Sequence, residues 1–228
     1  MNKTQTIWMG IGIFERLYSE DKISAYFSAL DRLPNKKVLL LADEISGCND
    51  FVLMGKKFDR KKDALLLKKY KIKSRKKFKP KYDAIKLLIE SSTHPNRWKV
   101  CHWDFLSANK QYQLLLNQLR DGIEKFENHY LKKEVLKTTI FGFGARLRKN
   151  FTASFVDFVF DKNFYLFLET LSQYTLEEIA ATLFLAKNNW IKAGHEEEKP
   201  YDELTRLCHE RFKNNFLSSA SSLEFYYI

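Results

Sequence analysis

Tyr174 and Glu178, a tyrosine and a glutamate four positions apart, are a pair whose spacing could serve chemistry. In a helix this spacing places both side chains on one face, one turn apart. A carboxylate can bind an amine and accept its proton, and a phenol nearby adds a second polar contact. The run from Thr175 to Glu178 also fits a capping box, in which Glu178 would only accept a backbone N–H at a helix start. Taken by itself, the pair fits an amine-binding site and a helix cap equally well.

Two glycines, Gly10 and Gly12, lie in the apolar run 7–13, which is predicted to be a short buried strand. A Gly-x-Gly at the end of a strand opens the dinucleotide-binding fingerprint, but its third glycine would be at position 15, where Glu15 stands. A carboxylate at that turn would repel a pyrophosphate. The five histidines and three cysteines have no spacing typical of a zinc site. We therefore expect no nucleotide, no metal and no cofactor.

The positive charge of the chain is concentrated in one segment. Residues 56–81 contain 14 lysines and arginines and two aspartates, a net charge of +12, whereas the whole chain carries +11. The segment predicts one long helix, roughly over residues 54–77 with Pro80 near its end, and its charge indicates a surface for a polyanion. A solvated helix face without a ligand is the alternative. The lysines expected to form the binding stripe are Lys62, Lys69, Lys73, Lys76 and Lys77.

The rest of the sequence alternates between predicted strands and helices. Ser19 begins a helix that ends near residue 33, and the apolar run 38–42 is typical of a strand covered on both faces. Strand, helix and strand in succession predict a βαβ unit. The fold class is therefore α/β, a Rossmann-like parallel sheet flanked by helices, with one long basic surface helix. The remaining expected elements are helices over 82–92 and 109–136, a strand over 98–104, a loop and a helix over 191–215, and a last strand over 223–228.

Length and composition support a single domain over residues 1–228. With 45% hydrophobic and 15% aromatic residues, 8 glycines and 4 prolines, the composition is globular and no segment has the character of a linker. The sequence contains no apolar stretch of transmembrane length and no signal-peptide pattern. We expect a cytoplasmic monomer that does not contact a membrane.

Several of these segments, in this order, resemble the tRNA-dependent cyclodipeptide synthases, whose fold is similar to the catalytic domain of class Ic aminoacyl-tRNA synthetases. Gly10–Glu15, followed by a helix ending in Lys22, is similar to the first strand and turn of that family. The basic helix is similar to its tRNA-contacting helix. The other segments that carry the resemblance are Val38–Asp43, Cys101–Asp104, Tyr174 with Glu178, and Phe216–Tyr226. Together they cover nearly the whole chain.

The resemblance implies a reaction as well as a fold. Members of the family take two aminoacyl-tRNAs, whose esters are already activated, and release a cyclic dipeptide (a diketopiperazine) without ATP or a cofactor. A serine in the first turn forms an aminoacyl-enzyme, and the register anchored on Gly10 and Lys22 places Gly12 at that position. Glycine has no nucleophilic side chain and cannot form an acyl-enzyme. The alternative is therefore a tRNA- or RNA-binding protein on the same fold that has lost catalysis.

The resemblance also assigns roles to single residues. Besides the Gly12 position, it counts Tyr174, Glu178 and Tyr226 as catalytic, and Tyr201 is a rival match for the active-site tyrosine. An indole at position 8 would favour a small first amino acid; the alternative is that it packs in the core on the other face of the sheet. The basic helix is expected to bind aminoacyl-tRNA through phosphates. The residues expected to line the substrate site are Trp8, Gly10, Glu15, Leu40, Ala42 and Tyr201.

Overall fold

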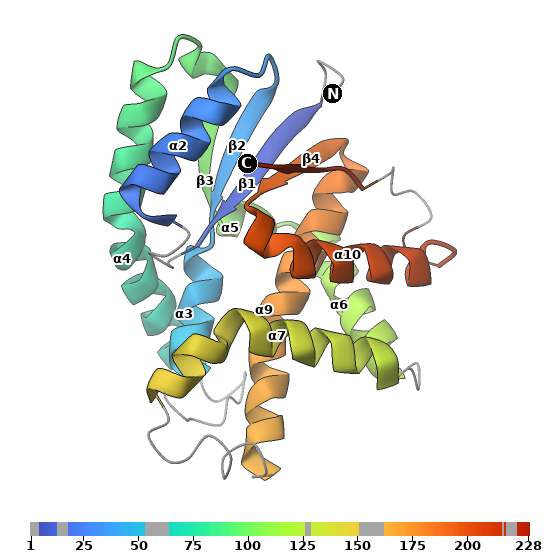
Figure 1. Ribbon diagram of the computed structural model, residues 1–228. Coiled ribbons are helices and arrows are strands. Elements are labelled where there is room, and N and C mark those ends of the chain that lie inside the picture. The colour runs from blue at the N-terminus through green and yellow to red at the C-terminus, as the bar shows by residue number, and fades with distance from the viewer. Residues whose placement is uncertain are drawn as a thin grey trace.

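The computed structural model describes residues 5–12, 18–52, 64–125, 129–150, 162–215, 217 and 223–228 (Figure 1). Within these ranges the strands form one parallel sheet of five strands in the order β3-β2-β1-β4-β5. The strands are β1 (Thr6–Ile11), β2 (Lys36–Leu41), β3 (Trp98–His102), β4 (Trp190–Gly194) and β5 (Phe225–Tyr227). The sheet and its flanking helices confirm the predicted α/β, Rossmann-like class.

The strand order reverses at β1, which lies between β2 and β4 in the sheet. From β1 the chain moves outward to β2 and β3, and it later returns to the other side of β1 to form β4 and β5. In open parallel sheets such a reversal leaves a crevice at the carboxyl ends of the two strands, where ligands bind. Gly12 directly follows β1, so the position expected for a nucleophile lies at this reversal.

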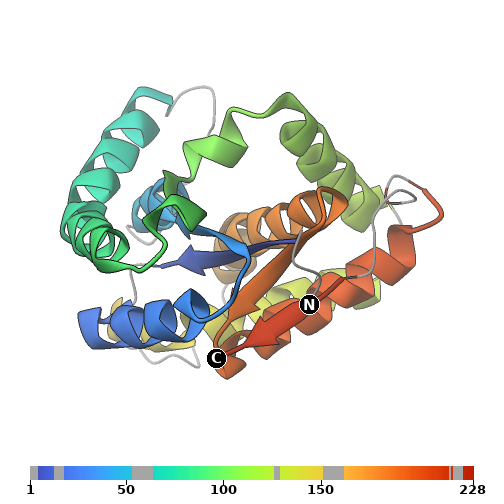
Figure 2. The same cartoon turned by 90° about the horizontal axis from the view of Figure 1, so that it is seen from above.

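Helices cover both faces of the sheet (Figure 2). They are α2 (Glu20–Asp31), α3 (Asp43–Val52), α4 (Ala64–Ser91), α5 (Asp104–Ser107), α6 (Lys110–Lys125), α7 (His129–Asn150), α9 (Lys162–Lys187) and α10 (Lys199–Phe212), with short 3-10 helices η1 (Pro95–Arg97) and η2 (Glu196–Glu198). Side chains along β1 alternate between the faces. Ile7 and Met9 pack with α2 and α4, whereas Trp8 packs with α6, α9 and α10. None of the described helices combines the length and apolar character needed to cross a membrane.

The described part of the basic segment belongs to one continuous helix, α4, which runs through Pro80, so the predicted separation into helices ending near 77 and spanning 82–92 is wrong. The predicted start of the helix, near residue 54, falls within residues 53–63, which are outside the described residues. A proline inside a helix costs about 3 kcal/mol because it removes one hydrogen bond and crowds the preceding turn. Phe78 and Ile85, on either side of Pro80, are both completely buried against the sheet. Their burial keeps the two halves of α4 in line, and Pro80 itself faces solvent.

Strand β4 occupies the start of the segment that was predicted to be a loop, and this prediction is wrong. Ile191 and Ala193 are buried as in any central strand, but Lys192 lies between them. A lysine is almost never fully buried unless it is paired, so the charge gave the segment the pattern of a polar loop. The structure pairs this lysine with several carboxylates, which allows the strand to form.

The other predicted elements agree with the structure or differ in their bounds. Ser19 caps α2, with its hydroxyl accepting a hydrogen bond from the Lys22 amide at 3.5 Å. The strands expected over 98–104 and 223–228 are β3 and β5. The helix expected over 109–136 corresponds to α6 and α7, and residues 126–128 between them lie outside the described residues.

Helix α3 was not predicted, and it crosses α4 at very short range. The crossing depends on Gly47, because a Cβ atom there would lie 2.9 Å from the Lys71 Cα and 3.0 Å from the Tyr70 carbonyl oxygen. Both contacts are backbone atoms, which cannot rotate away. Glycine at this position therefore sets the distance between α3 and the basic helix.

We expect Gly47→Ala to lower the free energy of unfolding by about 2 kcal/mol, because an added methyl group overpacks the α3–α4 contact. Urea unfolding of the variant and the parent would measure the loss. Gly10→Ala is the matched control, since its Cβ would meet the nearest atom, in the Trp8 ring, at an ordinary 3.8 Å. Equal losses from the two substitutions would show that the crossing can relax without cost.

Candidate active site

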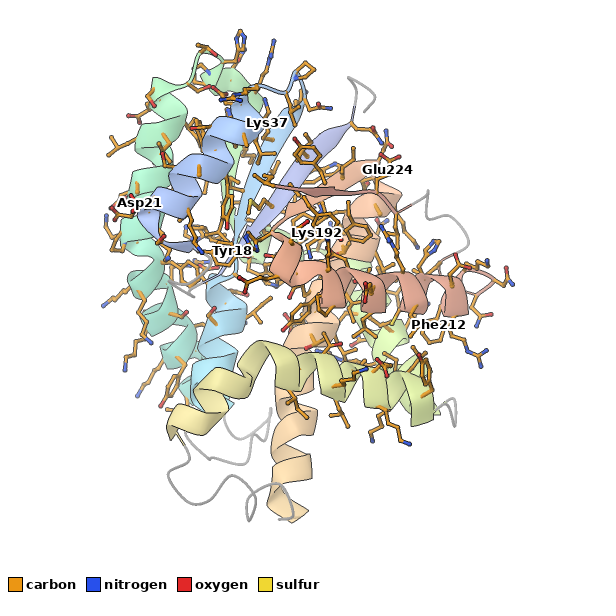
Figure 3. The ribbon with its side chains drawn as sticks, in the orientation of Figure 1. Tyr18, Asp21, Lys37, Lys192, Phe212 and Glu224 are labelled. Carbon is orange, nitrogen blue, oxygen red and sulfur yellow. The ribbon has the colours of Figure 1, made fainter. Side chains whose placement is uncertain are left out.

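A buried lysine in the middle of β4 is surrounded by three carboxylates. The Lys192 Nζ lies 2.7 Å from an Asp202 oxygen, 3.4 Å from Glu198 and 3.5 Å from Glu178. Only 2% of the lysine side chain is exposed. We call these four residues the Lys192 cluster. In Figure 3 the labelled Lys192 lies in the interior of the molecule.

Four separate elements supply the cluster. Glu178 comes from α9, Glu198 from η2 and Asp202 from the first turn of α10, while Lys192 belongs to β4. The position of the Glu198 carboxylate depends on Gly194, because a Cβ there would lie 2.7 Å from a carboxylate oxygen. The glycine at the end of the strand thus leaves room for the Glu198 carboxylate beside Lys192.

Tyrosine hydroxyls complete the polar contacts. Tyr18 donates a hydrogen bond to Glu198, and Tyr227 donates one to Asp202 at 3.0 Å. Burial, followed by the nearby Glu178 and Glu198, raises the pKa of Tyr201 well above 10.0. Burial and the Asp202 carboxylate raise the pKa of Tyr227 to about 12. At neutral pH Tyr201 and Tyr227 are therefore protonated, and the Tyr227 hydroxyl acts as a donor to Asp202.

The cluster holds more negative than positive charge. Burial raises the pKa of Glu178 from 4.5 to about 7, against the opposing effect of Lys192 and with a further increase from Glu198 and Asp202. Burial lowers the pKa of Lys192, but Glu198, Glu178 and Asp202 outweigh it, so the net shift is above 10.5. The lysine is thus charged, and Glu178 is the carboxylate that takes up a proton near neutral pH. Such an arrangement suits a second cation beside Glu178.

We expect the stability of Glu178→Gln to depend less on pH than that of the parent. Between pH 4.5 and about 7 the folded parent retains a proton on Glu178 that the unfolded chain releases. Its free energy of unfolding should therefore fall with rising pH across this window, by about 3 kcal/mol from this residue. Urea unfolding of both proteins across the window isolates the effect, because all other titrating groups are shared. Parallel curves would mean that Glu178 titrates normally.

The residues predicted from the Tyr174–Glu178 spacing lie in the middle of α9. Because α9 begins at Lys162, residues 175–178 do not start a helix, and the capping-box alternative is wrong. Thr175 instead pairs with Thr139 of α7, with 2.7 Å between the two hydroxyl oxygens. Glu178 contacts Lys192 as part of the cluster, while the Tyr174 side chain lies outside the described residues.

Three of the residues predicted to line the substrate site share a face of the sheet with the cluster. Trp8, Leu40 and Ala42 are buried in the core that α6, α9 and α10 cover, and Trp8 is directly opposite Lys192 in the β1–β4 pairing. Trp8 is 2% exposed, and it lies on the same face of the sheet as the cluster, not on the other face. Gly10 lies two residues further along β1, and Glu15 is outside the described residues.

The sequence did not decide whether Tyr201 or Tyr226 is the active-site tyrosine. In the structure Tyr201 lies with the cluster and Tyr226 does not. Tyr226 pairs with Ala193 and packs in the core on the α2 side of the sheet. The adjacent Tyr227 has the opposite orientation and reaches Asp202. A strand presents alternate side chains to opposite faces, so a one-residue difference decides which tyrosine faces the cluster.

Sequence reasoning missed Lys192, Glu198 and Asp202. Each lies in a run that is polar enough to be predicted as a surface loop. The signal that could have found them is a lysine flanked by Ile191 and Ala193, followed within ten residues by acidic residues that can neutralise it. A buried charge needs such a partner nearby.

The basic helix α4 has an anchored side and an open side. Lys71 pairs with Glu44 at 3.3 Å, and Arg75 bridges Asp43 at 3.0 Å and Asp104 at 2.9 Å. The exposed side carries the predicted stripe: Lys69, Lys73 and Lys76 make no ion pair or hydrogen bond with the described part of the chain. Lys77 is also exposed, and Lys62 lies outside the described residues.

The fold and the cluster define a Rossmann-like α/β protein with a charged site where the strand order reverses. No model of a known protein family and no curated protein sequence matches the chain. Solved structures do match, and several of them are cyclodipeptide synthases.

One from Fluoribacter dumoffii has a TM-score of 0.65 at 13% identity, with 97% of this chain and 88% of that chain covered. AlbC from Streptomyces noursei has a TM-score of 0.61 at 12% identity, with 99% of this chain and 95% of that chain covered. A third, from Staphylococcus haemolyticus, has a TM-score of 0.61 at 18% identity, with 91% of this chain and 84% of that chain covered. This chain therefore has the fold of the cyclodipeptide synthases, as the sequence resemblance predicted.

Proposed function

We propose that this protein binds aminoacyl-tRNA and transfers aminoacyl groups to form a cyclic dipeptide. The observation that carries the proposal is Glu178, a carboxylate with a pKa raised to about 7 in a cluster of three carboxylates and one ammonium. The cluster lies on the face of the sheet, and near the strand reversal, where this fold class binds ligands. The cyclodipeptide synthase fold supports the same class of substrate.

Glu178 suits the free α-ammonium that distinguishes an aminoacyl-tRNA from an uncharged tRNA. Its side chain is 20% exposed, more than those of Glu198 and Asp202, so it is the carboxylate of the cluster most open to a ligand. An entering ammonium would offset part of the excess negative charge and favour ionised Glu178. A charge-assisted hydrogen bond of this kind is about twice as strong as a neutral one.

The same carboxylate can prepare the amine for reaction. Amide formation requires a neutral amine, and a general base is most effective when its pKa lies near the working pH. Glu178, with a pKa near 7, can take the proton from the ammonium. The amine nitrogen then bonds to the ester carbon of a second aminoacyl group, the carbon–oxygen bond to the ribose breaks, and the ribose oxygen takes up a proton. A second attack of the same kind closes the ring.

The exposed side of α4 would hold the tRNA. Lys69, Lys73 and Lys76 recur at spacings of four and three, which aligns them on one helix face. Lysines bind phosphates as point charges, without reading the sequence of bases. The transfer site would therefore distinguish the amino acid, and the helix would recognise the nucleic acid.

Gly12 favours a second candidate function, aminoacyl-tRNA binding without transfer. At the position where the resemblance expects a serine, a glycine offers no atom to carry an aminoacyl group. Direct attack of one aminoacyl-tRNA on the other balances chemically without such an intermediate, but it requires both substrates to be bound together. The two candidates therefore differ in product and share the binding step.

Incubation with aminoacyl-tRNAs, followed by mass spectrometry of the small molecules released, tests the proposal. A diketopiperazine that is absent with uncharged tRNA, and absent with Glu178→Gln, is the expected result. Preferential binding of charged tRNA with no product would favour the second candidate. Equal binding of charged and uncharged tRNA would contradict both candidates.

A further inference from the structure

The six oxygen atoms of the three cluster carboxylates are not equally engaged. Both oxygens of Glu198 are taken, one by the Tyr18 hydroxyl and one by Lys192. Both oxygens of Asp202 are also taken, one by Lys192 and one by the Tyr227 hydroxyl. Glu178 accepts from Lys192 through Oε1 alone, and its Oε2 has no partner among the residues that the structure describes.

From this pattern we infer that Lys192 is a positioning residue, whose ammonium holds Oε1 of Glu178 so that Oε2 is presented to the amine of the substrate. The inference rests on the proposed function and goes beyond it, because it gives a role to a residue that does not touch the substrate. It also separates two parts of the cluster. Asp202 and Glu198 hold the lysine, and the lysine orients Glu178.

The contact distances support this division. Lys192 lies closest to Asp202, at 2.7 Å, and the two other contacts are longer, at 3.4 Å and 3.5 Å. Asp202 is as deeply buried as the lysine, with 2% of its side chain exposed. The lysine is thus fixed from the interior side, and Glu178 lies on the more exposed side of it.

Other charged and titratable groups also face the cluster, and a test must separate their effects from that of Lys192. They are Tyr18, Tyr26, Tyr201, Tyr227 and Arg206. Burial raises the pKa of Tyr26, Tyr201 and Tyr227, so these three phenols are neutral near neutral pH, and the carboxylates, Lys192 and Arg206 carry the local charge. With all four cluster residues ionised the net charge is −2, from three carboxylates and one ammonium.

A set of variants isolates the orienting contact from the net charge. Lys192→Met removes the ammonium, and Lys192→Arg keeps a cation. The double variant Lys192→Met with Asp202→Asn removes one cation and one anion, so the cluster keeps a net charge of −2 but Glu178 loses its holding contact. The double variant also carries the test if the single methionine variant does not fold.

Two measurements apply to each variant. The first is the titration of Glu178 in the ligand-free protein by carbon-13 NMR of labelled glutamate, with its signal assigned by its loss in Glu178→Gln. The second is the ratio of affinities for aminoacyl-tRNA and deacylated tRNA. We expect Lys192→Met to move the titration to higher pH by about one unit or more. In the double variant we expect the affinity ratio to fall about tenfold, and in Lys192→Arg both values should stay near those of the parent.

An affinity ratio in the double variant equal to that of the parent would overturn the positioning role, and so would an unchanged Glu178 titration in a folded Lys192→Met protein. Failure of the proposed function has a different result. The parent itself would then bind charged and deacylated tRNA equally well, while the NMR titration would still report whether Lys192 acts on Glu178.

Discussion

Gly12→Ser should give the protein a covalent aminoacyl adduct that the parent does not form. A serine oxygen at this position would attack the ester carbon of a bound aminoacyl-tRNA, the bond to the ribose oxygen would break, and the serine proton would pass to the released ribose oxygen. The expected observation is an added aminoacyl mass on the intact protein after incubation with charged tRNA. The effect is large because it replaces an absent side chain by a nucleophile.

The position of Gly12 in the sheet supports this expectation. It follows β1 directly, and the Ala42 amide beside it donates a hydrogen bond to the Ile11 carbonyl at 3.0 Å, which keeps the ends of β1 and β2 together. The site is the strand reversal, where catalytic groups of α/β proteins are found. A hydroxyl there would lie at the end of the strand whose neighbour, β4, carries Lys192.

Gly12→Ala is the matched control, since it adds the same Cβ without the hydroxyl. Any strain from a side chain at this position is then common to both variants. An adduct and a diketopiperazine only in the serine variant would mean that the chain has the fold and pocket of a synthase but lacks its nucleophile. Product from the parent as well would assign the transfer to direct attack or to another residue, and product from neither would favour a binding protein.

Reversing the charge of Lys69, Lys73 and Lys76 to glutamate should lower the affinity for tRNA on the order of 100-fold at low salt. The three lysines lie on the exposed side of α4 and have no described partner, so their loss should cost little stability. Because each phosphate contact releases counterions, the salt dependence of binding should also become shallower. Filter binding or fluorescence titration over a salt series measures both effects.

Lys36, Lys110 and Lys133 provide the control for this prediction. They are exposed, they come from β2, α6 and α7, and replacing all three by glutamate changes the net charge by the same amount. A similar loss of affinity in both triple variants would mean that overall charge, not the α4 surface, attracts the nucleic acid. Thermal unfolding of each variant would exclude a loss of fold.

The sequence was most informative where a single local rule decides the structure. The first three strands follow from apolar runs, and the α2 boundary follows from a hydroxyl cap at Ser19. The α4 boundary could not be predicted in this way, because burial of Phe78 and Ile85 overrides the effect of Pro80. At this boundary, tertiary packing outweighs local helix propensity.

The candidate site also combines a residue that a local pattern predicts with residues that only the tertiary structure brings together. Glu178 was predicted because its spacing from Tyr174 is visible in one segment. Lys192, Glu198 and Asp202 become a group only after β4 enters the sheet and η2 folds back, so no local pattern contains them. The choice between Tyr201 and Tyr226 likewise depended on strand register, which is set by pairing with β4. Resemblance to a family supplied the fold, and the buried charge was visible only in three dimensions.

The close α3–α4 crossing at Gly47, together with the ion pairs of Arg75, has a consequence for the size of substrate that the protein can bind. These contacts fix the lysine surface relative to the ends of the strands, so little conformational entropy remains to be lost when nucleic acid binds. A rigid separation between the phosphate-binding surface and the carboxylates also sets the distance that a substrate must span. Only a molecule whose charged backbone and reactive end are the right distance apart can reach both places at once, and an acceptor stem lengthened by one base pair would bind the helix with its ester displaced from Glu178.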